Sequence, residues 1–158
     1  MKRLIYIGAI FDWMDIELVE KLCEKHEVMM AGEKRIELPA GVNYVGKLAV
    51  ADVPKFIAKN EVGIIPFLRN ALTLDINNSK IYQFYALGLP VVSTLDNHAS
   101  RDAEVLTGNN HKSFLANIEK TDKINRETLV EIARQNDWQK QADRFAQELL
   151  NLSKNRLA

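Results

Sequence analysis

Residues 78–94, with the sequence NSKIYQFYALGLPVVST, decide the fold. The first part, 78–87, is predicted to form a helix that starts at the capping residues Asn-Asn-Ser of 77–79. Gly88 breaks this helix, and Pro-Val-Val-Ser at 90–93 is a short run typical of a buried strand. A helix that leads into a buried strand indicates a parallel α/β sheet, because parallel strands need crossover connections.

The same alternation of short apolar runs and helical patterns extends over the rest of the chain. The predicted strands are Leu4–Ile7, Val28–Ala31, Val42–Val45, Val62–Ile65 and a short one at Val105–Thr107; the predicted helices are 16–26, 51–60 with Asp52 as N-cap, and two or three pieces from 112 onward. This pattern predicts a doubly wound, Rossmann-like α/β fold with a parallel sheet of about six strands. Because no linker-like stretch interrupts the pattern, residues 1–158 are expected to form a single domain whose last helix spans about 138–154.

Composition excludes several classes of protein. The chain has 158 residues, 47% of them hydrophobic, and its 21 basic and 21 acidic residues give a net charge of zero. This balance argues against a nucleic-acid-binding protein, which needs a basic excess, and against a disordered chain. Asp12 and Asp15 interrupt the apolar N-terminus, so we do not expect a signal peptide. A single cysteine, Cys23, excludes an internal disulfide and favours a reducing, cytoplasmic location.

Ligands of such a sheet bind beyond the carboxyl ends of its strands, and the helix start at Lys80 is the most informative of these places. A capped helix start favours an anion, Lys80 adds a positive charge, and Gln83 lies one turn further on. Together they could hold a phosphate and a sugar hydroxyl. The alternative is an ordinary surface helix with a solvated lysine.

Two further strand ends also allow two interpretations. Gly8 permits the backbone to approach a ligand closely, but it could equally form a simple turn before a helix capped by Asp12 or Asp15. Phe67 could stack on a base or belong to the core, and the core is the more common place for an apolar residue after a buried strand.

Other signals are given a structural interpretation. The glycines form neither G-x-G-x-x-G nor a Walker loop. His98, Ser100 and Asp102 lie in one loop, whereas a hydrolase triad needs residues from separate elements. His26 near a helix end is explained by the helix dipole. The apolar stripe over 138–149 is expected to be a packing face.

Residues 78–94 resemble a hallmark of the C-terminal half of GT-B glycosyltransferases, a pattern like P-x-K-x-x-E-Y-x-A-x-G-x-P-V-V-S-T. Other pieces resemble the family in the same order. They are Tyr6-Ile7-Gly8 with Trp13, Asp15 and Leu18, then Asn43-Tyr44-Val45-Gly46, Val62–Phe67, and Asp137-Trp138 before a last helix. The resemblance therefore runs from about residue 4 to residue 150.

The resemblance implies a Rossmann-like domain that binds a nucleotide-sugar donor, most simply a UDP-sugar, without a metal or other cofactor. Lys80 matches a lysine that contacts the donor phosphate. Gln83 stands where most relatives have a ribose-binding Glu, a departure shared with glucuronosyltransferase-like members. The residues expected to contact the donor are Gly8, Phe11, Gly46, Lys47, Phe67, Ser79, Lys80 and Gln83.

Length is the main departure from the family. A complete GT-B enzyme has two such domains and about twice this length. The acceptor-binding domain, which usually carries the catalytic base, has no counterpart here, so no catalytic residue is assigned. We expect that domain elsewhere in a longer protein or on a second chain, and family members approach the membrane through lipid-linked acceptors.

Three functions follow as hypotheses. The first is the donor-binding half of a glycosyltransferase of bacterial cell-surface polysaccharide synthesis, inactive alone. The second is a non-catalytic module of the same fold that binds a nucleotide or a partner. A nucleotide-sugar isomerase or hydrolase is a weaker third, because the sequence shows no convergent acid and base.

Overall fold

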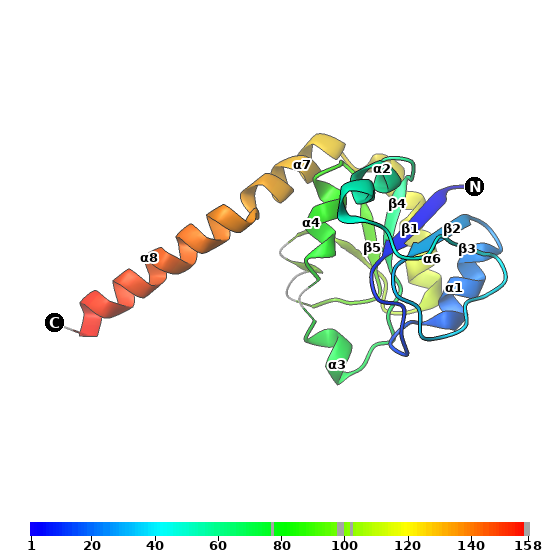
Figure 1. Cartoon of the computed structure of the whole chain (residues 1–158), viewed down its shortest axis with the longest axis horizontal. Coiled ribbons are helices and arrows are strands. Elements are labelled where there is room, and N and C mark those ends of the chain that lie inside the picture. The colour runs from blue at the N-terminus through cyan, green and yellow to red at the C-terminus, as the bar shows by residue number, and fades with distance from the viewer. Residues whose placement is uncertain (77, 98–99, 102, 157–158) are drawn as a thin grey trace.

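A computed structural model describes residues 1–156 apart from Asn77, His98, Ala99 and Asp102, with side chains up to Glu148. The predicted fold is confirmed. One sheet of six parallel strands has the order β3-β2-β1-β4-β5-β6 (Figure 1). The strands are β1 Arg3–Ile7, β2 Glu27–Ala31, β3 Val42–Tyr44, β4 Val62–Ile65, β5 Val91–Ser93 and β6 Leu106–Thr107.

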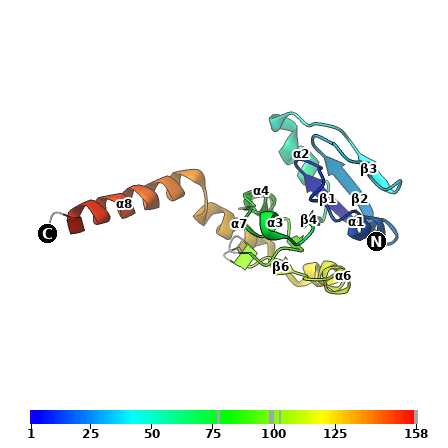
Figure 2. The same ribbon diagram turned by 90° about the horizontal axis from the view of Figure 1, so that it is seen from below.

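Helices cover both faces of this sheet. They are α1 Ile16–Cys23, α2 Val53–Ile57, α3 Ala71–Leu74, α4 Lys80–Tyr85, α6 His111–Lys120, α7 Arg126–Gln135 and α8 Trp138–Arg156, with 3₁₀ turns η1 Val50–Asp52 and η2 Thr121–Lys123. α1 and α6 lie on one face, and α2 and α4 lie on the other, where α7 packs against α4 (Figures 1 and 2).

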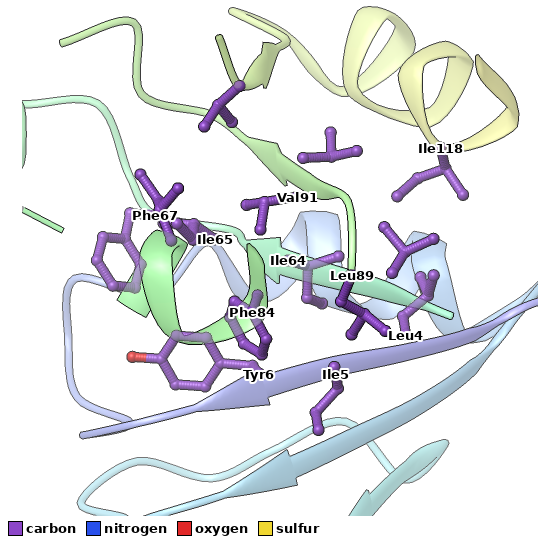
Figure 3. Packing of buried hydrophobic residues seen from close by; sticks show 14 of the residues in the cluster. Leu4, Ile5, Tyr6, Ile64, Ile65, Phe67, Phe84, Leu89, Val91 and Ile118 are labelled. Atoms are coloured by element: carbon purple, nitrogen blue, oxygen red, sulfur yellow. The ribbon is translucent and has the colours of Figure 1, made fainter. Parts of the chain in front are cut away.

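The core forms between β1, β4, β5 and the helices on both faces (Figure 3). Leu4 and Ile5 of β1 and Ile64 of β4 are completely buried. Burying each such side chain contributes about 1.5–3 kcal/mol. Strands that are covered on both faces must be apolar almost throughout, which is why short apolar runs were sufficient to predict them.

The helix ends show where the expected caps form. Asp15, one of the two candidates, caps α1, because its Oδ1 accepts a hydrogen bond from the Leu18 amide at 3.0 Å. The predicted caps Asp52 and Ser79 occupy cap positions, but neither side chain makes a cap hydrogen bond. Both residues already have helical backbone angles, which differ from those of a side-chain-capped helix start.

The last helix does not pack against the sheet as the sequence predicted. α8 extends away from the sheet (Figure 2), and Trp138 and Phe145 are 85% and 63% exposed. The interpretation of the stripe over 138–149 as a packing face against this domain is therefore wrong for these two residues. None of the helices in the described part of the chain combines the length and the apolar character needed to cross a bilayer.

His26 lies buried between the amino end of β1 and α6. Its Nδ1 accepts a hydrogen bond from the Lys2 amide at 3.4 Å. Burial lowers the pKa of the imidazole, and the nearby charges of Lys2 and Lys25 lower it further. The Glu119 carboxylate, 3.9 Å away, opposes this effect but does not reverse it. The fold thus favours the neutral imidazole, whereas a helix dipole would stabilise the protonated ring.

This burial predicts a loss of stability in mild acid. The unfolded chain takes up a proton at His26 near its ordinary pKa of 6.5, whereas the folded chain takes it up only at lower pH. The contribution of His26 to stability is thus present above pH 6.5 and lost as the pH falls through the folded-state pKa. Urea unfolding at about pH 7.5 and about pH 5.5 should show a smaller decrease for His26→Gln than for the unchanged protein. Equal decreases would contradict this account.

Candidate functional site

The strand order reverses between β1 and β4. From β1 the chain proceeds outward through β2 and β3, and from β4 it proceeds the other way through β5 and β6. Loops that leave the carboxyl ends of β1 and β4 therefore diverge, and a doubly wound sheet holds its ligands in the crevice between them. The loop after β1 stays close to its neighbours there, since Ile10 pairs with Lys34 and Met14 pairs with Phe67.

Two glycines bring backbone and side chains unusually close at this edge. Gly8 and Gly32 have φ angles of +142° and +140°, which favour glycine. A Cβ at Gly32 would lie 1.9 Å from the Gly8 carbonyl oxygen, and a Cβ at Gly8 would lie 2.3 Å from Cε of Lys80. The neighbour that lies close to Gly8 in this structure is the side chain of Lys80.

Lys80 places a cation at the carboxyl end of β1. Its stem lies on Gly8, and its Nζ is 5.8 Å from the centre of the Tyr6 ring. The side chain is partly buried, and burial lowers the pKa of its ammonium group. Among the residues that the structure describes, no carboxylate forms an ion pair with Lys80. This end of the sheet thus carries a partly desolvated positive charge that has no ion-pair partner among the described residues.

The helix that begins at Lys80 is shorter than expected. α4 has six residues rather than the predicted ten, and the Ser79 side chain accepts no cap hydrogen bond. Asn78 is 3% exposed, and its side-chain nitrogen has no partner in the described part of the chain. A short helix has a small dipole, so the attraction for an anion rests mainly on the charge of Lys80.

Ser79 and Gln83 line a groove that Lys80 does not reach. Both line a groove of about 1150 Å³ between α4 and the helices α7 and α8, together with Tyr82, Arg134 and Trp138. Lys80 does not line this groove. The expected cluster of Ser79, Lys80 and Gln83 is thus divided, because residues on successive sides of a helix point into the hollows on either side of it.

Phe11 and Lys47 lie on the β2–β3 side of the crevice and are engaged by neighbours. The Phe11 ring packs between Trp13, at 4.8 Å, and the Arg35 guanidinium, at 4.5 Å. Lys47 Nζ lies 3.1 Å from a carboxylate oxygen of Glu33, which also pairs with Arg35. The Lys47 charge is therefore already balanced by Glu33, whereas no described carboxylate pairs with Lys80.

Gly46 joins this side of the crevice to β2. Its φ angle is +78°, and its carbonyl oxygen accepts a hydrogen bond from the Gly32 amide at 2.9 Å. A Cβ at Gly46 would meet nothing within 4 Å, so the space beside it is open. Its neighbour Lys47 is turned toward Glu33.

Phe67 fits the core interpretation. It is 3% exposed, and its ring meets the Tyr6 ring edge-on with 5.9 Å between centres (Figure 3). It also forms one wall of a second cavity of about 390 Å³. The residues that line this cavity are Asp15, Phe67, Arg69, Thr94, Asn109, Asn110 and His111. We call it the Asp15 cavity.

An Asp15–His111 pair in this cavity was not anticipated from the sequence. His111 Nε2 lies 2.9 Å from Asp15 Oδ2, and His111 begins α6 while Asp15 caps α1. The two residues are 96 positions apart. The sequence marked Asp15 only as a candidate helix cap and as part of the family resemblance, and no local motif links it to His111. Of the loop residues His98, Ser100 and Asp102, the first and last lie outside the described residues, and Ser100 is buried.

Comparison with known proteins adds information on the fold. The sequence matches no family model and no curated protein. The structure is similar to the glycosyltransferase GlyE of Streptococcus pneumoniae TIGR4, with a TM-score of 0.56 and 14% identity over 76% of this chain. It is also similar to a structure assigned as a UDP-N-acetylglucosamine 2-epimerase of Listeria monocytogenes, with a TM-score of 0.51 and 14% identity over 84% of this chain.

The class of fold follows from these neighbours. The chain has the Rossmann-like architecture of one half of a GT-B-type protein. It spans 32% of the length of the glycosyltransferase and 39% of the length of the epimerase. The remainder of each neighbour has no counterpart in this chain.

Proposed function

We propose that this chain is the donor-binding domain of a glycosyltransferase and that its ligand is a nucleotide sugar, specifically a UDP-sugar. The observation that carries the proposal is Lys80. Withdrawing a cation from water is unfavourable unless a negative charge compensates it, and none of the described carboxylates does so. Bound at the β1–β4 reversal, a diphosphate would supply that charge. One structural neighbour is named as a glycosyltransferase and the other after a UDP-sugar, which agrees with this ligand.

The proposed role in transfer is to hold the leaving group. During glycosyl transfer, negative charge develops on the diphosphate, and a fixed ammonium group nearby stabilises it without a bound metal. Transfer also needs an acceptor site and a base, which we place on a second domain or chain. In this proposal the complete enzyme acts on the cytoplasmic side of the membrane in bacterial surface-polysaccharide synthesis.

Isothermal titration calorimetry with UDP, GDP and ADP tests the proposal. We expect UDP to bind with a dissociation constant of about 1 mM or tighter, corresponding to about −4 kcal/mol, and to bind more tightly than GDP or ADP. Added EDTA should leave this affinity unchanged. Absence of binding by all three nucleotides, with circular dichroism showing a folded protein, would overturn the proposal.

A non-catalytic, partner-binding module is the second candidate, and the exposed face of α8 favours it. Trp138 and Phe145 are large apolar side chains that this domain leaves uncovered. Exposed aromatic residues on one helix face are typical of surfaces that another protein covers. Transfer activity by this chain alone would exclude the module, and activity that returns only with a second chain would support a divided enzyme.

A further inference from the structure

The Asp15 cavity lies where residues from four segments meet. The α1 start, the loops after β4 and β5, and the turn that leads from β6 into α6 all contribute to its lining. Its volume of about 390 Å³ falls within the range of small-molecule sites. None of the residues first expected to bind a donor, apart from Phe67, belongs to it.

The lining of this cavity offers both donors and acceptors. Arg69 donates through Nη1 to the Thr94 carbonyl and keeps other N–H groups for a ligand. Asn109 accepts a hydrogen bond from Asn110, which leaves its own NH₂ group to donate. Asp15 supplies carboxylate oxygens. The Asp15 carboxylate would repel an anion, and the Arg69 guanidinium would repel a cation. Hydroxyl groups, which both donate and accept hydrogen bonds, fit the whole lining.

Asp15 is held in one orientation. Its Oδ1 accepts a hydrogen bond from the Leu18 amide at 3.0 Å, and its Oδ2 lies 2.9 Å from His111 Nε2. Lys21 Nζ is 3.0 Å from His111 Nδ1. Because an ammonium group can only donate, Nδ1 accepts, and the proton of the neutral ring is assigned to Nε2, facing Asp15. His111 is therefore a positioning residue that fixes the carboxylate, which is 14% exposed.

Two ring contacts connect the cavity with Lys80. Phe67 lines the cavity, and its ring centre is 5.9 Å from that of Tyr6 (Figure 3). Lys80 Nζ lies 5.8 Å from the centre of the same Tyr6 ring. The Tyr6 and Phe67 rings therefore lie between Lys80 and the cavity. One ligand with adjacent anionic and hydroxylated parts could occupy both.

We propose that the Asp15 cavity binds the hydroxyl-rich sugar of the ligand whose phosphates lie at Lys80, through Asp15, Arg69 and Asn109. This inference rests on the proposed nucleotide-sugar function and goes beyond it by naming the residues that distinguish a nucleotide sugar from the bare nucleotide. It makes these three residues determinants of specificity for the sugar rather than for the nucleotide.

Isothermal titration calorimetry tests the inference through one ratio, the dissociation constant of UDP divided by that of the sugar nucleotide. UDP is compared with UDP-glucose, UDP-N-acetylglucosamine and UDP-glucuronate. At least one sugar nucleotide should bind the unchanged protein about tenfold or more tightly than UDP, because two hydrogen bonds to charged groups are added. In Arg69→Met and in Asp15→Asn this ratio should fall toward one. Asn can still cap α1, so the second variant keeps the helix start intact.

Two controls make the result decisive. Arg126→Met removes an exposed arginine at the start of α7 and should leave the ratio unchanged. Lys80→Met should weaken UDP and the sugar nucleotides alike. The inference is overturned if UDP binds through Lys80 but every sugar nucleotide binds no more tightly than UDP. It is also overturned if both cavity variants keep the ratio. In either case the proposed function stands. If no nucleotide binds, the proposed function itself fails.

Discussion

Lys80→Met is expected to weaken UDP binding by about 1.5–3 kcal/mol, which is roughly a 10- to 150-fold loss of affinity, the scale of a hydrogen bond to a charged group. Methionine keeps an unbranched stem that can lie on Gly8 and beside the Tyr6 ring, but it removes the charge. The unfolding free energy should rise slightly or stay the same, because a partly buried cation that pairs with no described carboxylate no longer has to be accommodated.

The control for this variant is Lys59→Met. Lys59 is exposed two residues after α2, at the opposite edge of the sheet from Gly8. Calorimetry should give this variant the UDP affinity of the unchanged protein. An unaltered affinity in Lys80→Met, with both variants folded, would remove Lys80 from the site and with it the observation on which the proposed function rests.

Gly32→Ala is expected to destabilise the fold by about 3–5 kcal/mol. The added Cβ would lie 1.9 Å from the Gly8 oxygen and 2.6 Å from its carbonyl carbon, and both neighbours are backbone atoms that cannot rotate away. The Gly8 amide is tied to the Ala31 carbonyl at 2.9 Å, and the Gly32 amide to that of Gly46 at 2.9 Å. Either the strand ends must separate, or the whole β1 loop must move.

Urea unfolding measures this effect, and Gly46→Ala provides a matched control. Gly46 also has a positive φ, but its Cβ would enter open space, so only conformational strain of about 1–2 kcal/mol is expected. Loss of a cooperative transition in Gly32→Ala would agree with the account. A Gly32→Ala protein as stable as Gly46→Ala would show that the two loops are not packed against each other as described.

Most of the strands could be predicted because they are short apolar runs closed by Gly or Pro. Val62–Ile65, for example, is buried at every position and ends at Pro66, and the structure has β4 there. A strand that is buried on both faces needs apolar side chains at nearly every position, so the local composition is sufficient to predict it. Helix α3, by contrast, was missed because four residues with an Asn70 capping box carry too little periodicity.

The candidate site could be predicted only in part, because its contacts are distant in sequence. Gly8 and Lys80 could both be named from strand and helix ends, yet their mutual contact spans the chain from β1 to α4. The separation of Gln83 from Lys80 depends on where α7 and α8 lie, and the Asp15–His111 pair depends on the packing of α1 beside α6. Such contacts arise from tertiary packing, which no local pattern encodes.

The central claim is that the β1–β4 crevice binds a nucleoside diphosphate through Lys80. Amide chemical-shift mapping of the isotope-labelled chain during a UDP titration tests it most directly. The account predicts saturable shifts centred on Gly8, Gly32 and Lys80, and their loss in Lys80→Met. Saturable shifts confined to the groove at Trp138, or none at all at millimolar UDP, would contradict it.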